Sequence, residues 1–220
     1  MSTFNVPLAE EVLRSIIGHP EEHDQSTWFE VTDYEKLPKI DLSRDQTEDA
    51  AEESVTVTVQ GMLEGSCGST ACIAGWAALL SGWKVRTTKI LWDDGVEEVD
   101  SIAVSPEGTQ RQGGVDFENE GGELLGLDRD DAYFLFYNTA GEQAIVVLYG
   151  YIKGLNDPRQ VTSVARHLGV THEDAHPGEG DGDLAPSVFF DLTRAVVAEI
   201  RKEYPPLTLK EWQEKHELTS

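Results

Sequence analysis

Both cysteines of the chain lie five positions apart, in the segment Cys67-Gly-Ser-Thr-Ala-Cys72-Ile-Ala-Gly-Trp76. The apolar run that begins inside this segment predicts a helix over residues 70–80, with the hydroxyl of Ser69 or Thr70 as its N-cap. The start of a helix offers free backbone N–H groups and the positive end of a dipole, which favour a thiolate, a metal ion or an anion. This segment is therefore the first candidate for a catalytic or metal-binding site.

The first possibility is a structural zinc site. Cys67 and Cys72 could join His19 and His23 to give four sulfur and nitrogen ligands, as a tetrahedral structural zinc site requires. The alternative is that both cysteines are small buried hydrophobic residues and that the histidines lie at the surface. The cysteine spacing is compatible with zinc but not diagnostic of it. We therefore predict a protein without a cofactor and keep zinc as the alternative.

Cysteine-based catalysis is the second kind of chemistry. A helix N-terminus would activate Cys67, but a catalytic thiol also needs a general base beside it. None of the six histidines stands in a local pattern that marks such a base, so we predict no catalytic residue. The stretch 171–183 is rich in histidine, glycine and acids, but Pro177 and the glycines predict a solvated loop rather than a cation site.

The elements around these residues predict an α+β fold: a mainly helical single domain with a central buried helix and a small antiparallel sheet. Helices are expected over residues 7–17, 70–80, 117–125, from 128, 142–152, 158–168, 186–203 and after 208, a strand over 54–60, and a hairpin of 84–91 with 96–104. We expect residues 1–150 to form the main part and residues 151–220 to form a C-terminal helical extension packed on it.

The central helix is predicted to serve a structural role. Ala71, Gly75 and Ala78 belong to a stripe of small residues, which lets another backbone come close, and Trp76 is expected in the core.

Charge is the second strong feature. The 220 residues carry 41 acids and 17 bases, a net charge of −24, so direct nucleic-acid binding is disfavoured. Three explanations of this acidity are open. The charge can keep a solvated surface soluble, it can form an acidic surface that docks on a basic partner and in the limit imitates DNA, or it can reflect adaptation to high salt. No apolar run is long enough to span a membrane, and the N-terminus lacks the basic region of a secretory signal. These observations and the two cysteines predict a cytoplasmic protein.

Three motifs resemble those of a known group of proteins. They are Gln25-x-x-Trp28, the segment from Cys67 to Ala77, and Glu123-Leu-Leu-Gly126-Leu127-x4-Ala132-x2-Leu135-Phe136. Together they resemble uncharacterised proteins of bacteriophages, prophages and actinobacteria that carry a CGTxACxAGWA-type motif followed by LLGL-x4-A-x2-LF. Ser69 stands where that motif has Thr, which keeps a capping hydroxyl. The resemblance covers roughly residues 7–137. It implies a phage-encoded protein in the host cytoplasm, and it implies no particular reaction.

The sequence therefore predicts an acidic, non-enzymatic, phage-type protein that binds and modulates a host or phage protein with a basic surface. Trp28, Trp92 and Trp212 lie in polar neighbourhoods and are the expected aromatic anchors of that interface. One alternative is a cysteine-dependent enzyme or zinc-stabilised protein that uses Cys67 and Cys72. Another is a structural component of the virion.

Overall fold

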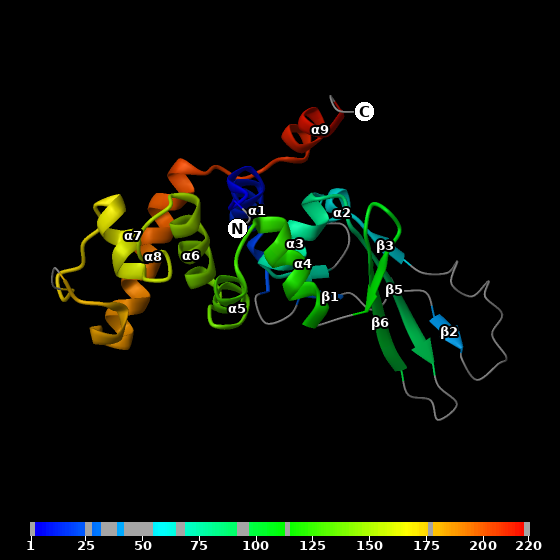
Figure 1. The fold of residues 1–220 in the computed structure, drawn as a ribbon, viewed down its shortest axis with the longest axis horizontal. Coiled ribbons are helices and arrows are strands. Elements are labelled where there is room, and N and C mark those ends of the chain that lie inside the picture. Colours follow the sequence, from blue (N-terminus) through cyan, green and yellow to red (C-terminus); the bar gives the residue numbers. More distant parts are fainter. Residues whose placement is uncertain are drawn as a thin grey trace.

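The computed structural model describes residues 3–24, 28–31, 39–41, 55–64, 69–91, 97–112, 115–175 and 178–217. Within these ranges the fold is mainly helical with a small sheet, which confirms the predicted α+β class. Figure 1 shows three parts in a row: helices α6, α7 and α8 at one end, helices α1, α3 and α4 in the middle, and the hairpin of β5 and β6 at the other end.

The helices follow the apolar periodicity of the sequence closely. They are α1 (Val6–Gly18), α2 (Val59–Leu63), α3 (Ile73–Leu80), α4 (Val115–Leu125), α5 (Arg129–Tyr137), α6 (Glu142–Ile152), α7 (Val161–Leu168), α8 (Pro186–Glu203) and α9 (Leu209–Glu217). Side-chain caps fix several starts, since Asp128 accepts a hydrogen bond from the backbone N–H of Asp131 at 2.9 Å and Thr208 accepts one from that of Glu211 at 3.2 Å. No helix in the described ranges is long and apolar enough to cross a membrane.

The larger sheet is built on the predicted hairpin. Its strands are β2 (Lys39–Asp41), β3 (Val55–Val57), β5 (Lys84–Leu91), β6 (Glu97–Val104) and β7 (Gln110–Gln112). Strands β5 and β6 pair antiparallel along their full length, from Lys84 opposite Val104 to Leu91 opposite Glu97. The other edge of β5 is shared by β3, which pairs antiparallel with its first half, and β2, which pairs parallel with its last residues.

Two predicted boundaries before and at the central helix are wrong. The strand predicted over residues 54–60 ends at Val57, because the Thr58 hydroxyl caps α2 and accepts a hydrogen bond from the Gly61 N–H at 3.3 Å. The central helix α3 begins at Ile73 and not at residue 70, and neither Ser69 nor Thr70 caps it. Both belong to strand β4 (Ser69–Ala71), which pairs antiparallel with β1 (Phe29–Val31) and so occupies the backbone that the helix would need.

Helix α3 is the centre of the core, as predicted, because all eight of its residues are buried. Its small residues admit neighbouring backbone: a Cβ placed on Gly121 of α4 would lie 3.0 Å from the Cα of Ala74. On the C-terminal side, α7 and α8 pack on α6. An ion pair between Lys215 and Glu11 joins α9 to α1. Arg14 of α1 joins these ends, donating to the Pro205 carbonyl at 2.8 Å and pairing with Glu211 at 2.8 Å.

Candidate functional site

The three predicted metal ligands that the structure describes, His19, His23 and Cys72, lie near the start of α3. His23 lies beside Ala71, with its Nδ1 atom 3.1 Å from the Ala71 carbonyl oxygen and a β-bridge between the two backbones. The ring of His19 stacks on the indole of Trp76, with the ring centroids 6.5 Å apart. The segment after α1 therefore brings both histidines to the start of α3, where Cys72 occupies the N-cap position.

Hydrogen bonding selects the tautomer of His23. A carbonyl oxygen only accepts, so Nδ1 carries the proton and Nε2 presents a lone pair. This Nε2 atom is buried and has no hydrogen-bond partner. Burial lowers the pKa of His23, so the neutral imidazole is favoured in the fold.

Glu22 is a buried acid at the same place. Only 6% of its surface is exposed, and its Oε2 atom makes no hydrogen bond. Burial, with a smaller contribution from the neighbouring charge of Glu21, raises the pKa of Glu22 to about 7. The Nδ1 atom of His19 lies 3.8 Å from the Glu22 carboxylate, which is an ion pair when that imidazole is protonated.

Cys72 is a poor nucleophile in this environment. The thiol is free and buried, and burial raises the pKa of Cys72 to about 11, although the backbone N–H groups of Ala74 and Gly75 oppose the shift. At neutral pH Cys72 is therefore a protonated thiol, which is the less reactive form. This disfavours the cysteine-dependent alternative as far as it rests on Cys72.

The zinc prediction stays open at its other cysteine. Among the described residues, no three histidine, cysteine or acidic side chains are placed to hold a metal ion together. Cys67 lies outside the described residues, so the four-ligand set of Cys67, Cys72, His19 and His23 is neither formed nor refuted.

The residues predicted to be structural all lie in the interior. Ala71, Trp76 and Ala78 are at most 1% exposed. A Cβ placed on Gly75 would lie 2.2 Å from the carbonyl oxygen of Trp28. The small residue at position 75 therefore lets the chain before β1 cross α3 in contact with its backbone.

The two predicted tryptophan anchors that the structure describes are not among the exposed aromatic residues. Trp28 and Trp212 are partly buried and pack against the core, and the rings of Trp28 and Phe29 lie 5.7 Å apart. Trp92 lies outside the described residues. Their role in an interface stays a prediction.

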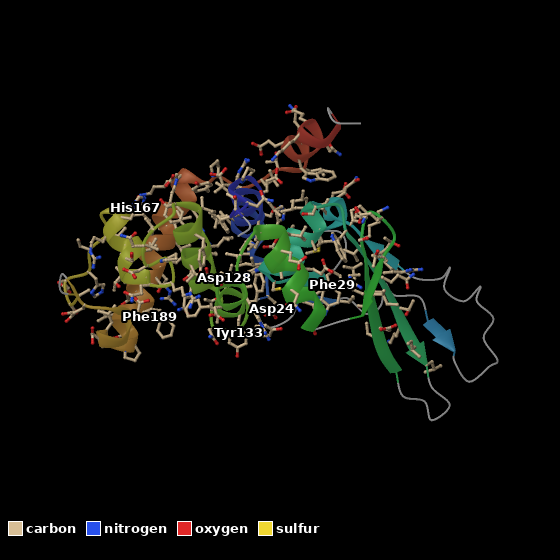
Figure 2. The ribbon with its side chains drawn as sticks, in the orientation of Figure 1. Asp24, Phe29, Asp128, Tyr133, His167 and Phe189 are labelled. Carbon is tan, nitrogen blue, oxygen red and sulfur yellow. The ribbon has the colours of Figure 1, made fainter. Side chains whose placement is uncertain are left out.

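A different set of aromatic residues is exposed on α5 and α8. Tyr133 and Tyr137 are each 53% exposed, with ring centroids 5.3 Å apart, and Phe190 is 61% exposed beside Phe189. Figure 2 shows the labelled Tyr133 and Phe189 on the same, lower side of the helical part. We call Tyr133, Tyr137, Phe189 and Phe190 the aromatic surface.

Carboxylates and a groove border the aromatic surface. Asp130 is exposed one helical turn before Tyr133, and Asp191 is exposed next to Phe190. Phe189 and Phe190 line a groove of about 460 Å³ whose other walls include Asp181. The surface can therefore offer both an apolar contact and negative charge to a partner.

Residues 178–183 are tied to α7 more closely than the solvated loop that the sequence predicts. Asp181 starts a short 3-10 turn, and its carboxylate accepts hydrogen bonds from the backbone N–H groups of Val161 at 2.7 Å and Thr162 at 2.9 Å. It thus caps α7 from twenty residues away, and α7 begins at Val161 rather than at residue 158. His172 and Glu179 line a cavity between α7 and α8.

Comparisons with known proteins do not supply a function. No family model matches the chain, and neither a curated protein nor a solved structure is significantly similar to it. The functional assignment therefore depends on the chemistry of the sites described above.

Sequence reasoning missed both Glu22 and the aromatic surface. Glu22 stands in an acidic run, Glu21-Glu22-His23-Asp24, in which nothing distinguishes the buried member. The aromatic surface did leave a signal, since the helical period places Tyr133 and Tyr137 four positions apart, on the face that carries Asp130.

Proposed function

We propose that this protein is a non-enzymatic binding protein that docks on a basic segment of a host or phage protein through the aromatic surface. The single observation that carries this proposal is the position of the exposed large hydrophobic side chains. Tyr133, Tyr137 and Phe190 are the ones that the described part of the chain exposes, and carboxylates flank them. Exposed aromatic residues bordered by charge are typical of interaction surfaces.

The chemistry of the surface favours a cationic partner. The faces of tyrosine and phenylalanine rings attract lysine and arginine side chains, and each such contact is worth roughly 0.5–1 kcal/mol at an exposed site. Asp130 and Asp191 can pair with the same cations. The net charge of −24 attracts a basic partner over a longer range and raises the rate of encounter. The resemblance in the motifs suggests a phage protein that acts on a host or phage component.

A pull-down experiment compares a variant of the aromatic surface with a control variant in another part of the fold. Immobilised wild-type protein, the double variant Tyr133→Ser/Tyr137→Ser and the control Glu107→Gln are incubated with host lysate at low salt. Glu107 is exposed at the turn between β6 and β7, in another part of the fold. We expect a partner that the wild type and the control retain, that the tyrosine variant loses, and that rising salt releases.

Retention of the same partner by the double variant, with an unchanged circular dichroism spectrum, would contradict the proposal. Salt-independent capture would contradict its electrostatic part. Competition by a double-stranded DNA oligomer tests whether the surface imitates DNA, because a partner that binds DNA would then be displaced.

Two further measurements address the alternatives. Stoichiometric zinc that is lost on Cys67→Ser would favour the zinc-stabilised protein. Detection of the chain in purified particles by mass spectrometry would favour a virion component.

A further inference from the structure

One edge of the larger sheet is only half covered. Strand β5 is lined on its outer edge by two short strands, with β3 beside its first half and β2 beside its second half. Within the described chain, β6 is lined on its outer edge by β7 alone, and β7 pairs only with residues 102–104. Residues 97–101 of β6 therefore pair with β5 on one side and with no described strand on the other. We call residues 97–101 the open edge.

The backbone of the open edge directs hydrogen-bonding groups outward at alternate residues. The N–H of Ser105 donates to the carbonyl oxygen of Thr109 at 2.9 Å, across the turn that joins β6 to β7. The register of β6 with β5 and β7 is continuous, and successive residues of a strand direct their N–H and C=O groups to opposite sides. The groups of Val99 and Ser101 therefore face the same way as those of Ser105, away from β5. Such an edge is a template for one more strand.

The open edge belongs to the part of the hairpin that extends away from the helices. Strand β6 packs mainly on β5 and β7. Figure 1 shows the turn end of β5 and β6 projecting beyond the helices, with β2 on the side of β5. An added strand can therefore lie beside β6, in line with β7, without displacing a helix.

Charge selects the kind of strand that fits. The open edge reads Glu-Glu-Val-Asp-Ser, with three acids and no base, and the turn before it contains Asp93 and Asp94. The facing residues of β5, 87–91, contribute one base, Lys89, which already has an interaction in the fold. Opposite charges on neighbouring strands stabilise their pairing, and like charges destabilise it. The open edge therefore favours a strand that carries lysine or arginine.

The same charges disfavour a second copy of this chain as the occupant. Two open edges that pair antiparallel about Val99 would place Glu98 opposite Asp100 of the other copy. Charged residues on an edge strand are a common protection against self-association. The occupant that the charges favour is thus a segment of another protein.

We propose that the open edge of β6 binds an extended, lysine- or arginine-bearing segment of a partner protein, which adds a strand to the sheet. The backbone groups of Val99 and Ser101 supply the hydrogen bonds, and the acids of the edge supply the preference for a basic segment. This surface lies on a different part of the fold from the aromatic surface of α5 and α8, and it does not depend on the function proposed for that surface.

NMR titration of the full, isotope-labelled chain with synthetic peptides tests the proposal. The probe is a capped heptapeptide of alternating lysine and valine, and its matched control has proline in place of the central valine, which keeps the charge and removes one N–H donor. We expect saturable chemical-shift changes at residues 97–101 and roughly tenfold slower exchange of the Val99 and Ser101 amides when the probe is bound. The proline peptide should bind roughly tenfold more weakly, and a peptide with glutamate in place of lysine should not bind.

A pair of variants tests the same contact from the side of the protein. Val99→Pro removes an outward N–H and should abolish binding of the probe, whereas Val99→Thr keeps that N–H and should bind like the wild type. The melting temperature of each variant verifies its fold. If the proline variant does not fold, the comparison of the peptides decides the question.

The other outcomes contradict the proposal. Equal affinity for the probe and the proline peptide would show that charge alone attracts the peptide and that no strand is added. Chemical-shift changes confined to α5 and α8 would place the peptide on the aromatic surface instead. A dimer of the free protein in light scattering, with the Val99 and Ser101 amides already protected, would make a second copy the occupant. Absence of shift changes in β6 at millimolar peptide would overturn the proposal as a whole.

Discussion

The buried carboxyl of Glu22 makes the stability of this protein depend on pH in an unusual direction. Its pKa is 4.5 in the unfolded chain and about 7 in the fold, because burial disfavours the charged form. Between these two values the folded protein keeps a proton that the unfolded chain loses. The stability that the protonated carboxyl contributes is therefore complete below about pH 4.5 and is lost as the pH rises to about 7.

The variant Glu22→Gln isolates this effect. Glutamine keeps the shape of the side chain and removes the titration. One pKa unit corresponds to about 1.4 kcal/mol, so the difference in unfolding free energy, variant minus wild type, should rise by about 3 kcal/mol between pH 4.5 and 7. At pH 8 the variant should be the more stable protein by about that amount, apart from a constant offset.

Urea unfolding of both proteins at a series of pH values measures this difference. Taking the difference also removes the opposite effect of His23, whose lowered pKa costs stability as the pH falls below 6.5 and which both proteins share. Glu21→Gln serves as the control, because Glu21 is exposed and the same change of charge there should give a much smaller slope. A difference curve that is flat across the window would refute the reasoning, since it would mean that water solvates the Glu22 carboxylate in the fold.

Three further substitutions test the packing and polar contacts. Gly75→Ala places a methyl group 2.2 Å from the Trp28 carbonyl oxygen, so we expect a loss of about 3 kcal/mol in unfolding free energy; an unchanged melting temperature would show that the two backbones separate freely. Asp181→Asn weakens two charge-assisted bonds at the start of α7 and should cost ~1 kcal/mol and speed amide exchange in α7; unaltered exchange would contradict this capping role. Arg159→Lys removes the double donation to Asp131 and should lower the urea midpoint; an equal midpoint would mean that one donor is enough.

Local patterns predicted the helices better than the strands. Residues 142–152 and 186–203 form helices with the predicted bounds, because their apolar residues keep the helical period. Gly141 is the N-cap residue of the first helix, and Pro186 begins the second. The alternation of polar and apolar residues over 54–60 did not predict where the strand ends, because the last residues of this segment belong to a helix. Val57 pairs with Val85, whereas Val59 begins a helix that also buries Met62 and Leu63.

The start of α3 shows what a single sequence cannot resolve. Ser69 and Thr70 are good N-cap residues, but Glu30, forty positions earlier, pairs with Thr70 and holds it in a strand. The convergence of His19 and His23 on α3 follows from the same pairing, since His23 bridges to the next residue, Ala71. The cavity between α7 and α8 had no local signal, because its walls come from two helices and the turn between them and meet only in the fold.

Several basic residues of this acidic chain join helices that are distant in the sequence. Arg14 pairs with Glu211, and Lys215 pairs with the buried Glu11, which fastens α9 to α1. Because these cations already pair with carboxylates of the chain, the acidic excess is left for the surface, where it repels anions and attracts basic segments. The same field therefore favours a basic protein at the aromatic surface.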